Sequence, residues 1–306
     1  MSQLVSTVEP ALSTDQVEAF DRDGFIVLKG VLGRDEADRL RQTIIDLIPR
    51  DLNIPWPWGI NGGRIKPYHE GYHEQTTRAG HEDDGMFDTP ELIPLLVNET
   101  VYRAAAQLMG RPNLRVQDGT IGITLRNDES NFATGGRRES DVDASGKSTM
   151  SQPLHVDPSI PDSEDNFTFS ASEMQVGAIY YLTDVEPKGG GLFAVPGSHR
   201  TVQQLCEASD QGRHLNNGWL DISGFPEPIE VTGQAGDVIL THYLIAHGAS
   251  YNRRARTRVA YFTRYSCLDH PFFPPPVPAV NRFNPRQLNA MGGSLGRRLM
   301  GVDDWD

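Results

Sequence analysis

The sequence predicts a mainly β protein in which helices flank a jelly-roll, cupin-like barrel. Helical patterns gather in residues 12–113, short apolar segments separated by turns follow from residue 114, and the two kinds do not alternate. A parallel sheet with crossover helices is therefore disfavoured. We expect a single domain over 1–306, made of N-terminal helices and a lid-like loop (12–113), a barrel core (114–265) and a C-terminal extension (266–306).

Capping residues and apolar spacing define the elements of the first third. The expected elements are a helix opened by a Ser13–Gln16 capping box, a buried strand at 24–28, an amphipathic helix from Asp35 to Ile48, a helix capped by Thr89 with Pro90 first, and a helix from Asn98 to Gly110. Residues 51–88 are irregular and rich in Gly, Pro, His and Trp, which is typical of a functional loop. Trp56 and Trp58 are candidates for an aromatic lid over a substrate, with core packing as the alternative.

The second part of the chain consists of short strands separated by polar loops. The expected strands are 120–126, the segment around His155, 174–182, 192–195, 238–242 and 257–265. The expected loops are 127–151 and 158–172, with a partly helical stretch at 201–220 and an amphipathic helix near 285–300.

Composition narrows the class of protein. The chain has 306 residues, 38% hydrophobic content and a net charge of −13, which repels nucleic-acid phosphates. The two cysteines fit a reducing compartment, and the sequence shows neither a signal-peptide pattern nor an apolar run of about 18 residues. We therefore expect a cytoplasmic protein that acts on a small molecule, with no nucleic-acid or membrane partner; no oligomeric state is predicted.

His155 and Asp157 are candidate metal ligands. Residues two apart on a strand point to the same side, so an imidazole and a carboxylate can meet at one ion. A second histidine would complete the two-histidine, one-carboxylate set that binds Fe(II) and leaves positions open. His247 follows a β segment and fits, and His242 is the nearby competitor. A similar triplet beginning at His81 lies among glycines and acids, which is typical of a loop.

A basic residue for a second ligand group follows. Arg258 lies on a strand 258 − 247 = 11 residues after His247. Its planar guanidinium suits a dicarboxylate that would chelate the metal with its other end. Arg256 has the same strand parity and is the alternative.

With these residues in view, the chain resembles the phytanoyl-CoA dioxygenase family of Fe(II)- and 2-oxoglutarate-dependent oxygenases. The resemblance covers 13–48 and 114–265. Its motifs are Asp23-Gly24-Phe25-Ile26-Val27-Leu28, His155-Val156-Asp157, Leu182-Thr183-Asp184-Val185, Val195-Pro196-Gly197-Ser198-His199-Arg200, Gly236-Asp237-Val238, His247-Gly248 and Arg258-Val259-Ala260.

The resemblance implies a double-stranded β-helix core, His155, Asp157 and His247 as iron ligands, and Arg258 as the 2-oxoglutarate anchor. Its spacing favours His247 over His242 and Arg258 over Arg256. It also implies O₂ as a co-substrate and oxidation of an unactivated C–H bond, most simply hydroxylation, with release of succinate and CO₂. The related halogenases lack the carboxylate that Asp157 supplies.

Three further residues are candidates for contacts in the same cavity. Thr124 and Arg126, on an earlier strand, could touch 2-oxoglutarate, and Gln175 shares its strand parity with Gly177 and Ile179 and could touch substrate. Ordinary strand-pairing or surface roles are the alternative for each.

Two rival functions are weighed against the oxygenase. His69-Glu70-Gly71-Tyr72-His73 matches H-E-x-x-H, which on a helix binds zinc with the glutamate as general base of a hydrolase. The segment follows Pro67, contains a glycine and lacks an apolar stripe, so a zinc hydrolase is disfavoured. A cupin-like binding protein without turnover is disfavoured because all four expected site residues are present.

Overall fold

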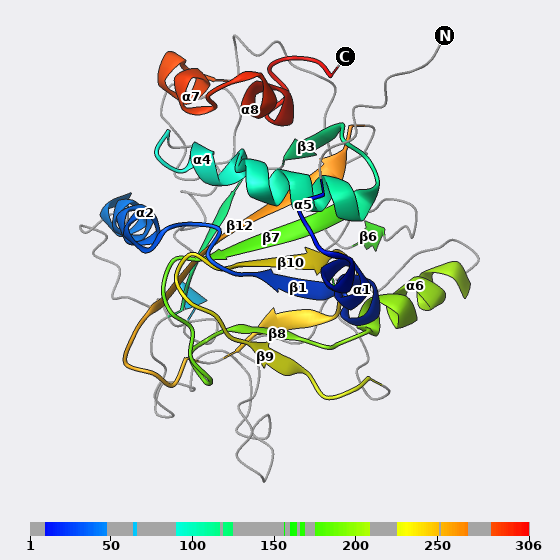
Figure 1. Cartoon of the computed structure of the whole chain (residues 1–306). Coiled ribbons are helices and arrows are strands. Elements are labelled where there is room, and N and C mark those ends of the chain that lie inside the picture. Colours follow the sequence, from blue (N-terminus) through cyan, green and yellow to red (C-terminus); the bar gives the residue numbers. More distant parts are fainter. Residues whose placement is uncertain are drawn as a thin grey trace, which may run out of the picture.

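A computed structural model describes most of the predicted barrel and the helices on it. The described residues are 10–47, 64–65, 90–116, 119–124, 156, 160–163, 166–168, 175–208, 225–250, 252–268 and 283–305. Among them, helices cover one face of a large sheet and a smaller sheet lies against its other face (Figure 1).

The N-terminal elements form where the capping signals place them. Helix α1 (Thr14–Asp23) has the predicted Ser13–Gln16 capping box and ends at Gly24, whose φ of 80° is the left-handed conformation that glycine adopts readily. Strand β1 (Phe25–Leu28) follows, and then helix α2 (Arg34–Leu47). These predictions are confirmed within the described residues.

Of the next two helices, one forms as predicted and the other begins at a different residue. Helix α5 (Glu99–Met109) has Asn98 as its N-cap and Gly110 in the left-handed conformation, as predicted. The predicted start of the preceding helix at Pro90 is wrong, because α4 (Ile93–Leu96) begins later, after Leu92. Leu92, Ile93, Leu95 and Leu96 are all buried, so apolar packing, and not a capping side chain, sets this short helix.

The large sheet is antiparallel and contains seven described strands. Its order is β1-β10-β7-β12-β4-β2, and β3 also pairs with β12. The strands after β1 are β2 (Arg64–Ile65), β3 (Leu114–Val116), β4 (Thr120–Thr124), β7 (Gln175–Tyr181), β10 (Val238–His242) and β12 (Arg258–Cys267). The three-stranded sheet has the order β11-β8-β9, with β8 (Leu192–Ala194), β9 (Ile229–Val231) and β11 (His247–Ala249).

Several segments differ from the predicted pattern. The expected loop 158–172 contains a hairpin of β5 (Ile160–Ser163) and β6 (Asn166–Thr168), and β2 lies within the expected irregular stretch. Helix α6 (Ser198–Ala208) begins before the predicted 201–220. The single C-terminal helix is instead two, α7 (Pro285–Ala290) and α8 (Ser294–Leu299), because Gly292 adopts a φ of 71° between them.

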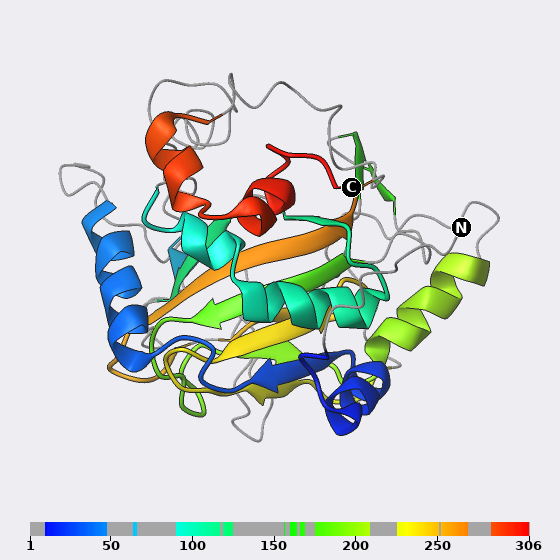
Figure 2. The same cartoon turned by 45° about the horizontal axis from the view of Figure 1, so that its top comes forward.

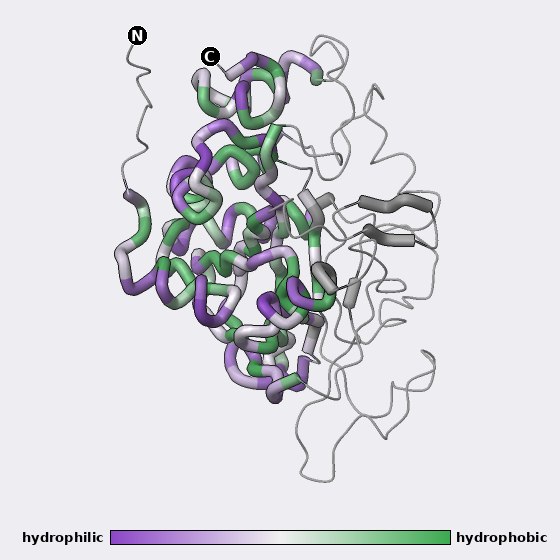
Figure 3. Tube along the Cα trace, turned by 90° about the vertical axis from the view of Figure 1, so that its right-hand side faces the viewer, coloured by the Kyte–Doolittle hydropathy of each residue, from purple (hydrophilic) through white to green (hydrophobic). Residues whose placement is uncertain are grey.

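The helices pack on the outer face of the large sheet (Figure 2). Alternate residues of β7 and β12 supply apolar side chains to this core, including the buried rings of Tyr180, Tyr261 and Tyr265. The hydroxyl of Tyr180 donates to the carbonyl of Leu95 at 2.7 Å, and that of Tyr265 donates to Leu96 at 3.0 Å. Figure 3 shows hydrophobic and hydrophilic residues alternating along the helices, as this one-sided packing requires.

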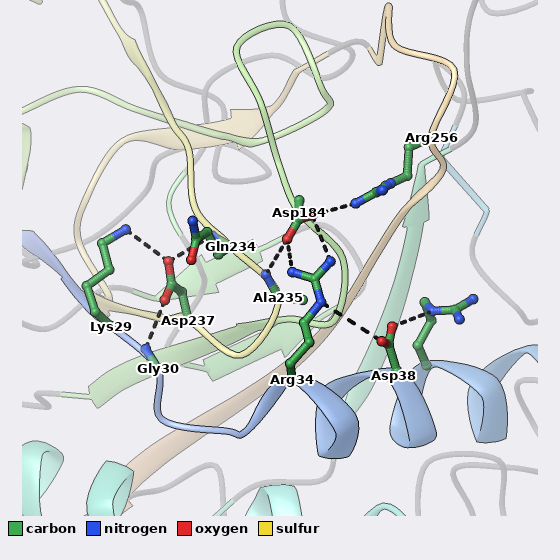
Figure 4. Close-up of polar contacts among 10 residues, drawn as sticks. Lys29, Gly30, Arg34, Asp38, Asp184, Gln234, Ala235, Asp237 and Arg256 are labelled. Atoms are coloured by element: carbon green, nitrogen blue, oxygen red, sulfur yellow. Dashed lines mark hydrogen bonds and ion pairs between the residues drawn. The ribbon is translucent and has the colours of Figure 1, made fainter.

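Two aspartates join the turns at one end of the barrel (Figure 4). Asp237 is buried and accepts from Lys29 Nζ at 2.9 Å and from the amides of Gly30 and Gln234 at 2.9 and 2.8 Å. Asp184 accepts a two-pronged contact from Arg34 at the start of α2. These bonds hold the pKa of each carboxyl below its usual value, against the opposing effect of burial.

Candidate functional site

The face of the large sheet that is turned toward the three-stranded sheet is called here the inner face. A second apolar cluster fills the space between the two sheets; it contains Ile179, Tyr181, Ile239 and Ala260 from the large sheet and Leu192, Ala194, Val231 and Ile245 from the other side. The hydroxyl of Tyr181 donates to the carbonyl of Val231 at 2.7 Å and accepts from the amide of Leu192 at 3.1 Å. Tyr181 therefore joins the two sheets, and burial raises its pKa to about 12, against the opposing charge of Arg258, so that it stays protonated.

Arg258 is the first residue of β12 and lies on the inner face. It is 3% exposed, and its register partner on β4 is Thr124. The Thr124 hydroxyl oxygen accepts from Nε at 3.1 Å and from Nη2 at 2.8 Å, and the guanidinium carbon lies 5.7 Å from the centre of the Phe262 ring. The strand and these contacts fix the orientation of a buried cation. Arg256 is instead exposed and pairs with Asp184 at the edge of the barrel.

His247 is the first residue of β11 and is half-buried opposite Ala194 of β8. Its Nδ1 lies 3.0 Å from the carbonyl oxygen of Ile245. A carbonyl can only accept, so Nδ1 carries the hydrogen, and the lone pair of the neutral ring is on Nε2. This is the tautomer that a metal ligand bonded through Nε2 requires.

His242, the alternative ligand, lies on the other face of the sheet. It pairs with Val176, which belongs to the outer core, and its ring packs 4.9 Å from that of His199 and 6.2 Å from that of Phe20. Its Nδ1 accepts from the amide of Leu244 at 3.1 Å. Burial, together with the nearby His199, lowers the pKa of His242 to about 3, so this ring is a neutral packing residue.

Contacts between the sheets place His247 along the barrel axis. At one end, Asn252 donates to the Thr124 carbonyl at 3.0 Å, so the turn after β11 lies level with Thr124 and Arg258. At the other end, the amide of Val195 donates to the carbonyl of Ala246 at 3.0 Å. Two residues later, the amide of Gly197 donates to the carbonyl of Asp23 at 2.9 Å, which places this segment beside the start of β1. His247 therefore lies between the Arg258 end and the β1 end.

The inner face is closed at the first end and partly accessible farther along. Arg258, Thr124, Ala260 and Tyr181 are buried, with exposures of 3% or less. Farther along, the partly accessible inner-face residues are Phe25, Val27, Gly177, Phe262 and Arg264. Strands β7 and β12 lie inside the sheet and their outer residues are buried under helices, so this accessibility is on the inner side, beside His247.

Several predicted site residues lie outside the described part of the chain. They are His155, Asp157, Arg126, Trp56 and Trp58, together with the H-E-x-x-H segment at 69–73 and the triplet beginning at His81. Val156, between the two predicted ligands, is described and buried. Within the described residues, no three His, Cys, Asp or Glu side chains gather in a metal-binding group. The complete ligand set of a metal site therefore stays a prediction.

The structure gives positions to Thr124 and Gln175. Thr124 contacts the guanidinium of Arg258, a role that the sequence did not indicate. Gln175 is 1% exposed at the start of β7, opposite Ser266. The sequence reasoning missed Tyr181, Phe262 and Arg264; the last two share the parity of Arg258 on β12, and that signal could have found them.

None of the helices in the described ranges is both long and apolar enough to cross a membrane.

Comparison with known proteins identifies related sequences and folds. The family model described as phytanoyl-CoA dioxygenase matches residues 20–260. The ectoine dioxygenase of Sphingopyxis alaskensis is 23% identical over 314 residues, covering 94% of this chain and 89% of that protein. The ectoine dioxygenase of Bordetella parapertussis is 22% identical over 278 residues, covering 87% and 79%.

Solved structures show the same fold at low sequence identity. The non-heme alpha-ketoglutarate-dependent carbocyclase SnoK from nogalamycin biosynthesis matches with a TM-score of 0.53 and 20% identity, covering 84% of this chain and 85% of that one. EctD from S. alaskensis, in its apoform, gives a TM-score of 0.56 and 18% identity, covering 87% and 81%. The predicted jelly-roll fold is confirmed.

Proposed function

Because the chain belongs to the phytanoyl-CoA dioxygenase family, we propose that it hydroxylates an unactivated C–H bond of a small-molecule metabolite. It is a non-haem Fe(II)- and 2-oxoglutarate-dependent dioxygenase, so O₂ and 2-oxoglutarate are consumed and succinate and CO₂ are released. In this proposal the whole chain, 1–306, works as one domain.

One observation supports the site assignment most strongly. A buried guanidinium, that of Arg258, lies at the closed end of the inner face, and His247 with its lone pair on Nε2 lies farther along the same space. We assign the distal carboxylate of 2-oxoglutarate to Arg258, because a planar guanidinium binds carboxylate through two hydrogen bonds. We assign iron to His247 together with His155 and Asp157.

The donor set suits ferrous iron. Two imidazoles and one carboxylate leave positions open for a chelating co-substrate and for O₂. When bound, the iron supplies the activation of O₂ and the oxidation of the C–H bond.

The described residues have three roles in this proposal. Arg258 binds and orients the co-substrate, Thr124 orients Arg258, and Tyr181 with its apolar neighbours closes that end against water. The Ile245 carbonyl keeps the His247 hydrogen on Nδ1.

The comparisons indicate the reaction more narrowly than the substrate. Similar proteins are named for ectoine and for nogalamycin biosynthesis, and both compounds are small molecules. We extend to this chain only the general class, a small metabolite.

The test is iron-dependent turnover of 2-oxoglutarate. Purified protein with Fe(II), 2-oxoglutarate and O₂ is expected to release succinate, and His155→Ala and His247→Ala are each expected to abolish it. His69→Ala is the matched control and is expected to retain turnover without added substrate. A zinc hydrolase and an inert binding protein would both release no succinate; the hydrolase would instead show a zinc-dependent activity that needs no O₂ and is lost in His69→Ala.

A further inference from the structure

The accessible part of the inner face carries a second arginine. Arg264 lies 264 − 258 = 6 residues after Arg258 on β12, so both side chains leave the strand on the same side. At a strand rise of about 3.3 Å per residue, the two α-carbons are about 20 Å apart. Arg258 is buried, whereas Arg264 is partly accessible, together with Phe262 between them.

Strand register places Arg264 at the β1 end of the inner face. It pairs with Gly177 of β7, which pairs in turn with Thr241 of β10, which pairs with Phe25 of β1. Arg258 lies at the opposite end, paired with Thr124. His247 lies between these two ends, so the arginines approach it from opposite directions along the barrel.

A single 2-oxoglutarate molecule cannot account for both arginines. A five-carbon dicarboxylate that binds Arg258 with one carboxylate and a metal on His247 with the other has no further carboxylate for Arg264. It also ends before the row of paired residues that contains Arg264. Arg264 therefore faces the part of the space that is left for the primary substrate.

The surroundings of Arg264 favour an anion. A side chain at Gly177 would place its Cβ 2.4 Å from the Thr241 hydroxyl oxygen, so Thr241 covers this glycine. A guanidinium and a hydroxyl, both hydrogen-bond donors, thus flank one glycine on the inner face. Across this row and the next, the described inner-face residues are Phe25, Val27, Gly177, Ile179, Ile239, Thr241, Phe262 and Arg264, and of these only Arg264 is charged.

We propose that Arg264, assisted by Thr241, binds the anionic group of the primary substrate. The substrate is then a small molecule with a carboxylate or phosphate at one end and an apolar portion against Phe262 and Val27, which places its reacting C–H bond near His247. This inference rests on the proposed dioxygenase function and narrows it to anionic substrates.

The experiment is a screen of matched pairs with the full-length enzyme, Fe(II) and 2-oxoglutarate. Each carboxylic acid is paired with its amide and each phosphate monoester with its alcohol, and stimulated succinate release is measured. The anionic member of a pair is expected to stimulate, and carboxylate and phosphate hits identify the source of the charge. Anaerobic binding of the same panel, followed by ligand-observed NMR, detects members that bind without reacting.

Variants then test the residue. Arg264→Gln is expected to raise the KM for the best hit by about tenfold or more, the factor expected when a charge-assisted contact is lost. Its dissociation constant for 2-oxoglutarate is expected to stay within about threefold, because Arg258 is intact. Arg264→Lys keeps the charge and is expected to recover part of the affinity, and Arg254→Gln, on an exposed arginine, is the control for net charge.

The outcomes separate the two proposals. If the wild type turns over 2-oxoglutarate but neutral pair members stimulate and bind as well as anionic ones, or no anionic member binds, the substrate proposal is wrong and the dioxygenase stands. It is also wrong if Arg264→Gln weakens 2-oxoglutarate as much as substrate. If Arg264→Gln does not fold, Arg264→Lys and Thr241→Val, each expected to raise the KM for the hit without affecting 2-oxoglutarate, decide it. Only a wild type without any 2-oxoglutarate turnover would overturn the proposed function itself.

Discussion

Replacing Thr124 by valine is expected to weaken the binding of 2-oxoglutarate without unfolding the protein. Valine keeps the branched shape at this buried position but removes the oxygen that accepts from Nε and Nη2 of Arg258. Hydrogen bonds to a charged group contribute about 1.5–3 kcal/mol, and one oxygen serves both donors here. A loss of about 2 kcal/mol corresponds to roughly a 30-fold change in an equilibrium constant.

The assay is an anaerobic calorimetric titration of the Fe(II) protein with 2-oxoglutarate. The dissociation constant of Thr124→Val is expected to rise by about 10- to 30-fold. Thr124→Ser keeps the hydroxyl and is the matched control, expected to stay within about threefold of the wild type. If Thr124→Val titrates like the wild type while Arg258→Gln loses binding, then Thr124 does not orient the anchor and the reasoning fails. If both variants bind normally, Arg258 is not the anchor.

Three other changes test the framework around the site. Asp237→Asn is expected to lower the free energy of unfolding in urea by about 1–3 kcal/mol, because the new amide nitrogen would face a backbone N–H group from which the carboxylate accepts a hydrogen bond. If the loss of stability were as small as that caused by Asp15→Asn, at an exposed position, this prediction would be contradicted. The pKa of His242 is about 3 in the folded protein, below its unfolded value. Its contribution to stability is therefore present above about pH 6.5, and as the pH falls toward the folded pKa it is lost at up to about 1.4 kcal/mol per pH unit. His242→Asn is expected to flatten this slope in denaturation curves measured across that pH range, and an unchanged slope would refute the assignment. Gly122→Ala would place a Cβ 2.4 Å from the Phe262 ring, so it is expected to displace that ring from Arg258 and weaken 2-oxoglutarate in the same titration; normal affinity would show that the ring does not hold the anchor.

The sequence predicted most elements whose signals are local. The Ser13 capping box, the Gly110 helix end and the parity of the long strands each depend on a few neighbouring residues, and the structure has them. The start of α4 was mispredicted because Thr89 and Pro90 resemble a cap, whereas the burial of four apolar residues decides where that helix forms. Tertiary packing overrides a local signal in this case.

The site was predictable to the extent that it depends on strand parity. Parity alone allowed either Arg256 or Arg258, and the two separate only because β12 begins at Arg258 while Arg256 lies in the preceding turn and pairs with Asp184. Parity likewise could not separate His242 from His247, since the choice depends on where the chain crosses from one sheet to the other. The contact between Thr124 and Arg258 joins residues 134 apart in the sequence, and no local pattern could indicate it.

Strand β12 shows how one segment serves both stability and chemistry. Its outer residues, Val259, Tyr261 and Tyr265, pack under the helices and are buried to 2% exposure or less. Its inner residues include a buried arginine at the start of the strand, Arg258, and a partly accessible one farther along, Arg264. Substitutions at odd positions should therefore lower stability first, and substitutions at even positions should alter ligand affinity first. If Tyr261→Phe changed substrate affinity as much as Arg264→Gln without a comparable change in stability, this division of roles along the strand would be wrong.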